Sequence, residues 1–167
     1  MIKLFSRKKE KHSSVYAPVN GTVIPESEIP DEAFASGMLG HGVGIIPKDS
    51  CFYSPVDATV IDVTPTKHAY SLLASDGTEI LLHIGIDTVT LNGKGFESLV
   101  KKGDKIKLGA PLARVDFDVV ENAELSIITA LIIINHDELS EILVKTGDCK
   151  IKETEIIRYK KKKKNGK

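Results

Sequence analysis

Short runs of alternating apolar and polar residues, separated by turn residues, dominate the chain from Val15 onward. A period of two is the pattern of half-buried β-strands, and many short strands at close spacing indicate an all-β, antiparallel sandwich or barrel. The longest uncharged stretch, residues 125–135, is far too short to span a membrane. It predicts a fully buried strand, and we expect residues 127–134 to run through the centre of the fold.

Helical signals are few and short. We expect single helical turns at residues 31–36 and at residues 96–100. A third turn is expected at residues 137–144, with Asn135 or Asp137 as its N-terminal cap. The fold class is therefore an all-β sandwich or barrel with a few short helical turns.

One predicted strand carries reactive groups on a single face. Alternation over residues 80–87 turns the apolar side chains toward the core and leaves the other face to the remaining residues. The core face holds Ile80, Leu82, Ile84 and Ile86, and the opposite face holds Leu81, His83, Gly85 and Asp87. On that opposite face only His83 can serve as a nucleophile, and we expect Gly85 to leave clearance beside the imidazole for a phosphate or a partner. Alternation alone also fits a strand histidine that a neighbour satisfies.

A hairpin brings a second histidine beside His83. The dipeptide Asp76-Gly77 lies between two apolar-rich runs and is a strong hairpin signal. With these two as the turn residues, the expected pairs are Leu73 with Ile80, Tyr70 with His83, and His68 with Gly85. His68 and His83 are then diagonal neighbours on one face, about 7 to 8 Å apart and within reach of each other. Thr66 lies on the same face two residues before His68, so the pattern predicts a site.

Two segments repeat within the chain. Residues 16–24 (YAPVNGTVI) match residues 53–61 (YSPVDATVI), and residues 100–104 (VKKGD) match residues 144–148 (VKTGD). The two offsets differ, so the chain is not a solenoid of fixed period. Duplication of a strand-turn-strand unit explains both matches.

Charge is segregated along the chain although the net charge is zero. Residues 1–12 hold five basic residues and one acid, residues 158–167 hold seven basic residues and no acid, and residues 13–157 hold 11 basic and 22 acidic residues. We therefore expect a basic flexible arm at 1–14, one domain at 15–157, and a Lys-rich flexible tail beyond it. The acidic domain suits a basic protein partner and argues against nucleic-acid binding, and the tails would make at most weak contact with an anionic membrane surface.

The cysteines and the N-terminal segment indicate a compartment. Cys51 and Cys149 are far apart in sequence and form no zinc-ribbon or dithiol motif. Residues 1–12 lack the apolar central segment of a secretory signal. We expect both thiols to be reduced and the protein to be cytoplasmic.

These features together resemble the glucose-class enzyme IIA proteins of the bacterial phosphoenolpyruvate-dependent sugar phosphotransferase system (PTS). The resemblance extends from Tyr16 to about Asp148 and rests on residues 17–23 (APVNGTV), 30–37 (PDEAFASG), 65–69 (PTKHA), 81–89 (LLHIGIDTV) and 91–96 (LNGKGF). It implies a flattened antiparallel β-sandwich built from a duplicated hybrid motif. It also implies a phosphotransferase without a required cofactor, which accepts a phosphoryl group from the phosphocarrier protein HPr and passes it to a cysteine of a IIB domain of a membrane sugar permease.

The same resemblance implies roles for single residues. His83 matches the phosphoacceptor, His68 its active-site partner that stabilises the phosphoryl group, and Thr66 the residue that orients His68. Asp87 matches an acidic residue at the rim of the site.

The chain departs from the family pattern at two positions, and two other functions compete. His41 stands where members of the family carry aspartate near the rim of the site, and Ala58 replaces the glycine of the second repeat. Zinc peptidases share similar folds but need three close ligands, for which only His68, His83 and His41 are candidates. Incidental zinc between His68 and His83 within a complex is a milder form of this alternative. The other is a regulatory binding module whose affinity for target proteins depends on phosphorylation of His83.

Overall fold

The structure is a computed structural model and describes residues 12–163. Its strands are β1 (Ser13–Tyr16), β2 (Gly21–Pro25), β3 (His41–Pro47), β4 (Cys51–Tyr53), β5 (Ala58–Val63), β6 (Ala69–Ala74), β7 (Glu79–His83), β8 (Phe96–Ser98), β9 (Lys105–Ile106), β10 (Pro111–Val115), β11 (Thr129–Ile133), β12 (Leu139–Val144), β13 (Gly147–Cys149) and β14 (Glu155–Lys161). The helical segments are η1 (Glu26–Glu28), α1 (Glu32–Ala35), η2 (Thr88–Leu91), α2 (Phe117–Asn122) and η3 (His136–Glu138). The predicted all-β fold class with a few short helical turns is confirmed.

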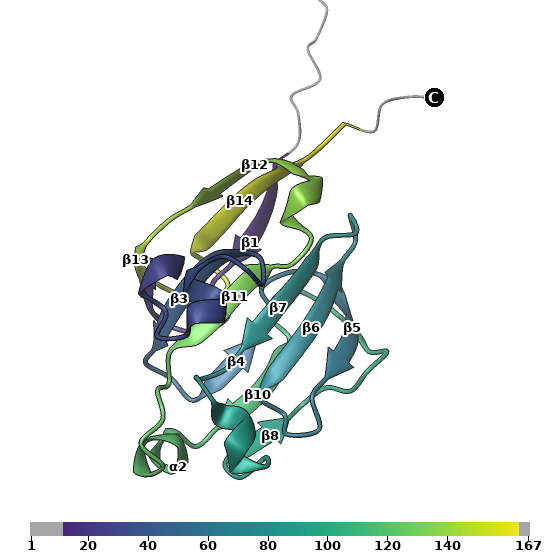
Figure 1. The fold of residues 1–167 in the computed structure, drawn as a ribbon. Helices are drawn as coiled ribbons and strands as arrows, with labels where there is room; N and C mark the ends of the chain where they lie inside the picture. Colours follow the sequence, from purple (N-terminus) through teal and green to yellow (C-terminus); the bar gives the residue numbers. More distant parts are fainter. Residues whose placement is uncertain (1–11, 164–167) are drawn as a thin grey trace, which may run out of the picture.

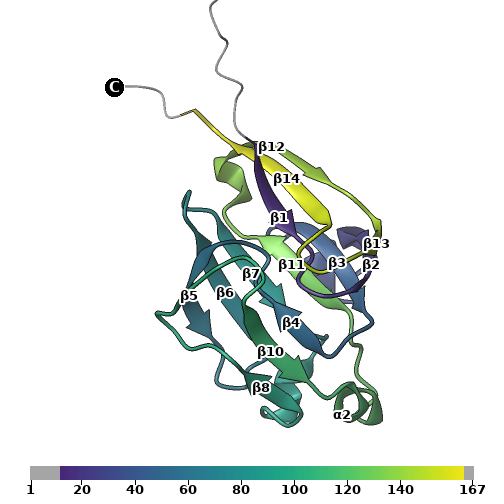
Figure 2. The same ribbon diagram turned by 180° about the vertical axis from the view of Figure 1, so that it is seen from behind.

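The strands form one large and two small antiparallel sheets (Figures 1 and 2). The large sheet has the order β13-β2-β3-β11-β7-β6-β5-β9, and the small sheets have the orders β1-β14-β12 and β4-β10-β8. The small sheets pack on the large one as a second layer, as Figure 2 shows from behind. All five residues of β11 are buried at the middle of the large sheet, where the uncharged run was expected.

The sheet order shows that the duplication is nested. We call β1–β3 with β11–β14 the first repeat and β4–β10 the second repeat. Outward from the central strands β11 and β7, the large sheet reads β3, β2 and β13 in the first repeat and β6, β5 and β9 in the second. Each small sheet belongs to one repeat, so the second repeat is inserted between the third and fourth strands of the first.

Strand register fixes which residues of the two repeats correspond. The repeated segments align β2 with β5, and their first residues pair as Gly21 with Pro47 and Ala58 with Ala74. Pro47 therefore corresponds to Ala74. Six residues before Pro47 is His41 and six residues before Ala74 is His68, so these two histidines correspond.

The same correspondence extends into the central strands. In the first repeat, Ile45 of β3 pairs with Thr129 of β11. In the second repeat, the corresponding Leu72 of β6 pairs with Ile80 of β7. Three residues further along β11 and β7, Ile132 of the first repeat therefore corresponds to His83 of the second.

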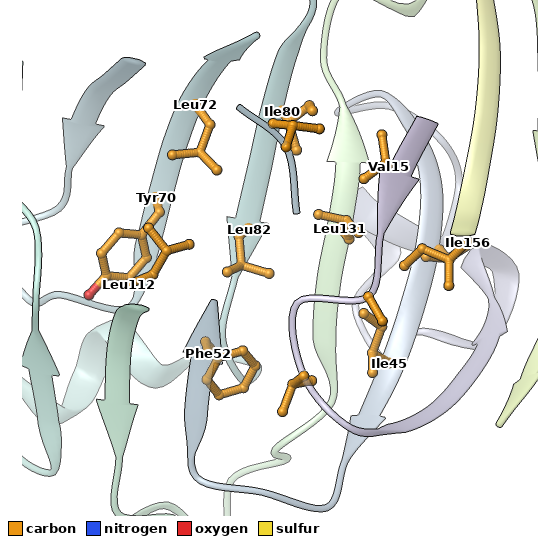
Figure 3. Packing of buried hydrophobic residues seen from close by; sticks show 14 of the residues in the cluster. Val15, Ile45, Phe52, Tyr70, Leu72, Ile80, Leu82, Leu112, Leu131 and Ile156 are labelled. Atoms are coloured by element: carbon orange, nitrogen blue, oxygen red, sulfur yellow. The ribbon is translucent and has the colours of Figure 1, made fainter. Parts of the chain in front are cut away.

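Two apolar clusters lie on opposite faces of the large sheet. The main cluster fills the space between the layers and includes Tyr70, Leu82 and Leu131, all without exposed surface (Figure 3). The second cluster lies on the other face and consists of Ile29, Phe34, Ile86, Ala130 and Ile132. Burying this much apolar surface on both faces explains why the central strands are continuous apolar runs.

The predicted alternation holds up to His83 and fails at Ile86. Ile80, Leu82 and Ile84 lie in the main cluster as expected, but Ile86 lies in the second cluster. The reason is Gly85, whose φ of +75° ends the extended backbone and rotates the following residues.

The predicted hairpin exists, but its register is shifted by one residue. Ala69, rather than Tyr70, pairs with His83. The turn has three residues, because the Gly77 N–H donates to the Ala74 carbonyl and Gly77 adopts a φ of +88°. Asp-Gly signals fit both two-residue turns and three-residue turns with glycine in the left-handed region, so the dipeptide alone does not fix the register.

The helical predictions had mixed outcomes. A helical turn at 31–36 is confirmed as α1, whose N-cap Asp31 accepts a hydrogen bond from the Ala33 N–H. The turn at 96–100 is wrong, because these residues begin with strand β8, and residues 137–144 are mainly strand β12 after the short η3. Helix α2 was not predicted; it begins after Asp116, whose side chain accepts from the Asp118 N–H.

The ordered domain is longer at both ends than the predicted range of 15–157. β1 starts at Ser13, which pairs with Tyr159, and β14 continues to Lys161. Two antiparallel strands that complete each other's hydrogen bonds order these residues, in spite of their basic neighbours. The remaining predictions for the two basic tails fall on residues 1–11 and 164–167, outside the described residues.

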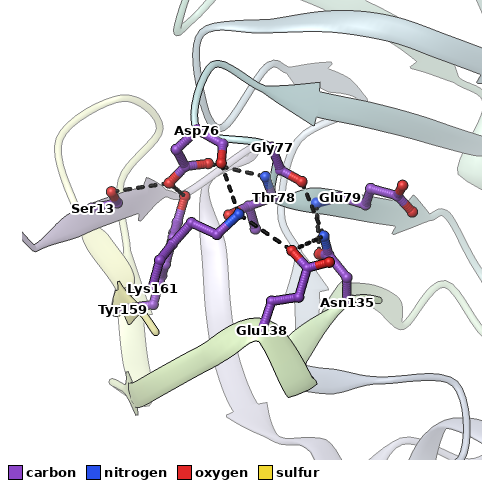
Figure 4. A network of polar contacts seen from close by, with 9 residues as sticks. All are labelled: Ser13, Asp76, Gly77, Thr78, Glu79, Asn135, Glu138, Tyr159 and Lys161. Atoms are coloured by element: carbon purple, nitrogen blue, oxygen red, sulfur yellow. Dashed lines mark hydrogen bonds and ion pairs between the residues drawn. The ribbon is translucent and has the colours of Figure 1, made fainter. Parts of the chain in front are cut away.

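A polar network joins the β6–β7 hairpin of the second repeat to the ends of the first (Figure 4). Asp76 Oδ2 accepts hydrogen bonds from Ser13 Oγ at 3.2 Å and from the Tyr159 hydroxyl at 2.8 Å. The Asp76 carbonyl accepts from Lys161 Nζ at 2.7 Å, and the Asn135 side chain accepts from the Glu79 N–H at 2.8 Å. These contacts fasten the tip of the hairpin, whose second strand ends at His83.

Candidate active site

His83 ends strand β7 and has one ring nitrogen committed to the backbone. Its Nδ1 lies 2.8 Å from the Gly85 carbonyl oxygen. Because a carbonyl can only accept, Nδ1 carries the proton in this hydrogen bond. The neutral ring then has its lone pair on Nε2, which is the nitrogen free to act as a nucleophile.

His68 lies directly beside His83, as the sequence predicted. The ring centroids are 4.9 Å apart and the rings meet edge to face. The His68 carbonyl accepts from the Ile84 N–H at 2.8 Å, so the backbones are also joined. The two rings meet in spite of the shifted register because His68 precedes β6, where the chain leaves the extended conformation at Lys67, with a φ of +60°.

Two hydroxyl groups surround Nδ1 of His68. Thr66 Oγ1 lies 2.6 Å from this nitrogen, and Thr64 Oγ1 lies 3.3 Å from it. Burial and, to a lesser degree, the neighbouring His83 lower the pKa of His68 to about 4, so His68 is neutral at physiological pH. Thr66 was predicted at this place, whereas Thr64 was not.

Gly85 and Asp87 shape the end of the strand. A side chain at Gly85 would overlap Thr88 and the Ser126 carbonyl, so the glycine permits close packing at this point, and clearance for a phosphate stays a prediction. Gly85 also supplies the positive φ and the carbonyl that holds His83. Asp87 lies close enough to stabilise a positive charge on His83.

The first repeat contributes a wall that the sequence did not reveal. The Phe34 ring of α1 meets the His83 ring edge to face, with centroids 5.1 Å apart. Burial is the largest influence on His83 and lowers its pKa, against the hydrogen bond to Gly85 and the charges of Asp31 and Asp87. Both residues lie in the segment 30–37 that contributes to the family resemblance, but they are about 50 residues before His83 and the segment alone does not indicate a contact with it.

His41 lies away from this pair, contrary to its predicted place at the rim. His41 pairs with Ile133 of β11, whereas His83 pairs with Ala130, three residues earlier in the same strand. The two histidines lie on strands that flank β11 on opposite edges. Nδ1 of His41 is 2.9 Å from Glu26 Oε2, and its ring centroid is 6.4 Å from that of His136. Within residues 12–163 no group of three or more His, Cys, Asp or Glu side chains is arranged to hold a metal ion, so the peptidase alternative gains no support.

Comparison with known proteins identifies the family. Residues 13–139 match the family described as phosphoenolpyruvate-dependent sugar phosphotransferase system, EIIA 1. The chain belongs to this family. Its relatives include a protein named PTS system glucose-specific EIIA component from Staphylococcus epidermidis, which is 45% identical over 93% of this chain and 95% of the relative.

Further similarities extend the comparison to a solved structure and a fused protein. The glucose permease IIA from Mycoplasma capricolum has a TM-score of 0.83 and 38% identity over 89% of this chain and 96% of that one. A PTS system glucose-specific EIICBA component from Staphylococcus saprophyticus is 49% identical over 75% of this chain but only 18% of its own length.

As an EIIA component the protein is a phosphotransferase. It takes a phosphoryl group from the phosphocarrier protein HPr and passes it to the IIB domain of a sugar permease. No helix of the described part of the chain is both long and apolar enough to cross a membrane.

Proposed function

We propose that Nε2 of His83 is the atom that accepts the phosphoryl group. The observation that carries this proposal is the hydrogen bond from His83 Nδ1 to the Gly85 carbonyl, which leaves the Nε2 lone pair available. The lone pair attacks phosphorus as the bond from phosphorus to the histidine of phospho-HPr breaks, and that histidine recovers its lone pair. Onward transfer repeats the exchange, with a cysteine thiolate of the IIB domain as the acceptor.

His68 is the residue that stabilises the phosphoryl group. Phosphoryl transfer demands positioning and neutralisation of the three equatorial oxygens rather than covalent chemistry from the protein. The Thr66 hydroxyl lies 2.6 Å from Nδ1 of His68 and can donate to it; neutral His68 then carries its proton on Nε2, where it can donate to a phosphoryl oxygen. Thr66 orients His68 at 2.6 Å, and Asp87 and Asp31 form an acidic rim that suits basic partner surfaces.

Several broader assignments belong to the same proposal. The relatives named glucose-specific support a glucose-type permease as the final acceptor. The transfer requires no cofactor, and zinc would bind between His68 and His83 only with further ligands from a partner. We place the protein in the cytoplasm, with the EIIA domain spanning the described residues between the two basic tails. Phosphorylation of His83 would also control binding of regulatory target proteins, because it adds charge to the docking face.

Labelling with phosphoenolpyruvate, enzyme I and HPr tests the assignment of His83. The wild-type protein is expected to acquire an acid-labile, alkali-stable label. The variant His83→Ala is expected to acquire none, a loss of at least about a thousandfold, since the nucleophile itself is removed. The variant His68→Gln is expected to accept the label but to release it slowly to IIB. A label retained by folded His83→Ala would refute the proposal.

A further inference from the structure

Thr64 occupies an unexplained position next to His68. It follows β5, and its hydroxyl oxygen lies 3.3 Å from His68 Nδ1. The same oxygen accepts a hydrogen bond from the Ala69 N–H at 3.1 Å. With that lone pair occupied, the hydroxyl proton is directed to His68 Nδ1 or to the Ala69 carbonyl, which lies 3.4 Å away. Thr64 therefore joins His68 to the first residue of β6.

The first repeat has a counterpart of this contact. Pro25, the last residue of β2, pairs with Val43, and Val63, the last residue of β5, pairs with Tyr70. Val43 corresponds to Tyr70, so Pro25 corresponds to Val63. The next residues along the chain, Glu26 and Thr64, therefore also correspond. Glu26 holds Nδ1 of His41 at 2.9 Å, just as Thr64 approaches Nδ1 of His68. The duplicated fold thus places a partner for the same ring nitrogen twice, independently of Thr66.

We infer that Thr64 is a positioning residue for the transfer reaction, which holds the neutral His68 ring in the tautomer that donates from Nε2. The inference rests on the proposed role of His68 as the stabiliser of the phosphoryl group. Of the two histidines, His68 is the one that the Thr64 hydroxyl approaches, so Thr64 acts through His68.

The chemical difference between Thr64 and Glu26 explains why a hydroxyl suits the site. A carboxylate only accepts, so it demands a proton on Nδ1 and favours the imidazolium form of a histidine. A hydroxyl can donate to Nδ1 and leaves the Nε2–H in place. Two hydroxyl groups, from Thr64 and Thr66, therefore agree with a buried and neutral His68.

Nitrogen-15 NMR of the histidine rings in Thr64 variants tests this inference without phosphoryl transfer. In the wild-type protein we expect His68 to show a protonated Nε2. Thr64→Val keeps the shape but removes the hydroxyl, so the signals should shift toward a mixture of tautomers, and Thr64→Ser should restore the wild-type pattern. Thr64→Glu should reproduce the environment of His41 and raise the pKa of His68.

Transfer rates complete the test. Thr64→Val should slow onward transfer to IIB about fivefold, the scale of one lost hydrogen bond, while labelling by HPr reaches the same extent. The variant Glu26→Thr makes the matched change in the first repeat and should leave both rates unchanged. If Thr64→Val leaves the His68 tautomer and onward transfer unchanged, the inference is wrong. If the tautomer changes but transfer does not, Thr64 positions His68 and the proposed role of His68 in transfer fails instead.

Discussion

His41 in the first repeat and His68 in the second occupy corresponding positions, at the start of β3 and just before β6, and each has a partner for Nδ1. Their neighbours on the adjoining central strand differ. The position that is His83 in the second repeat is Ile132 in the first, and Ile132 has no exposed surface. The second repeat therefore places two histidines side by side, whereas in the first repeat the position of the second histidine belongs to the second apolar cluster.

The connections before the two histidines account for this difference. Residues 26–40 join β2 to β3, whereas only residues 64–68 join β5 to β6. The long connection carries Ile29 and Phe34 onto Ile132, whereas no residue of the short connection belongs to this apolar cluster. Phe34 also contacts His83, so the cover of one repeat serves as the wall of the site in the other. A duplicated fold can thus keep one copy for chemistry and use the other as its support.

The sharpest way to break this comparison is to truncate Ile132. Ile132→Ala removes a fully buried side chain from the second cluster and should lower the free energy of unfolding by about 2–5 kcal/mol. Folded protein should still accept phosphate, because the reacting nitrogen lies on β7. Urea denaturation together with labelling at low temperature measures both effects.

The control for this prediction is the corresponding position, His83. His83→Ala truncates a half-buried side chain and should cost less stability than Ile132→Ala while it abolishes labelling. Equal stability losses in the two variants, or loss of labelling in folded Ile132→Ala, would contradict the idea that Ile132 stabilises the fold while His83 carries out the transfer.

The sequence was sufficient to predict the histidine pair and the duplication, because both are carried by local patterns. Alternation placed His83 on a strand, the Asp76-Gly77 turn brought His68 to it, and repeated segments marked the two copies. The register error did not destroy this prediction, since His68 lies outside the regular strand, where the strict alternation of faces no longer applies.

The remaining parts of the site depend on distant segments. Phe34 reaches His83 only because β3 and β7 both pair with β11, and nothing local to either residue encodes this neighbourhood. Residues 96–98 and 139–144 were expected to be helical, because such short apolar runs fit the helical period as well as the strand period. Their pairing with β10 and β14 makes them strands.

Asp76 links the two repeats through its hydrogen bonds with Ser13 and Tyr159, and its charge should contribute to stability. Burial raises the pKa of Asp76, but hydrogen bonds from Tyr159, Thr78 and Ser13 outweigh it, and the net pKa is lowered. Asp76→Asn keeps the size of the side chain but removes the charge that these donors stabilise. We expect a loss of about 1–2 kcal/mol in the free energy of unfolding near neutral pH.

The pH dependence of this loss follows from the sign of the shift. A carboxyl group with a lowered pKa in the folded state stabilises the protein above its unfolded pKa, and this contribution disappears as the pH falls through the folded value. The difference between wild-type protein and Asp76→Asn should therefore be largest near neutral pH and shrink below about pH 4, where the ordinary carboxyl titrates. Urea titrations at several pH values measure it, and a difference that grows on acidification would contradict the role of the charge.

The last prediction concerns His68, whose burial costs stability in acid. Its pKa falls from 6.5 to about 4 on folding, chiefly through burial and also through His83. Between these values the unfolded chain binds more protons at this position than the folded protein, so the free energy of unfolding decreases as the pH falls. His68→Gln removes this dependence, and its stability should decline less steeply than that of the wild-type protein between about pH 6.5 and pH 4. Parallel curves for the two proteins would mean that His68 takes up its proton as readily in the folded state as in the unfolded chain, and the donor role of a neutral ring would then lose its basis.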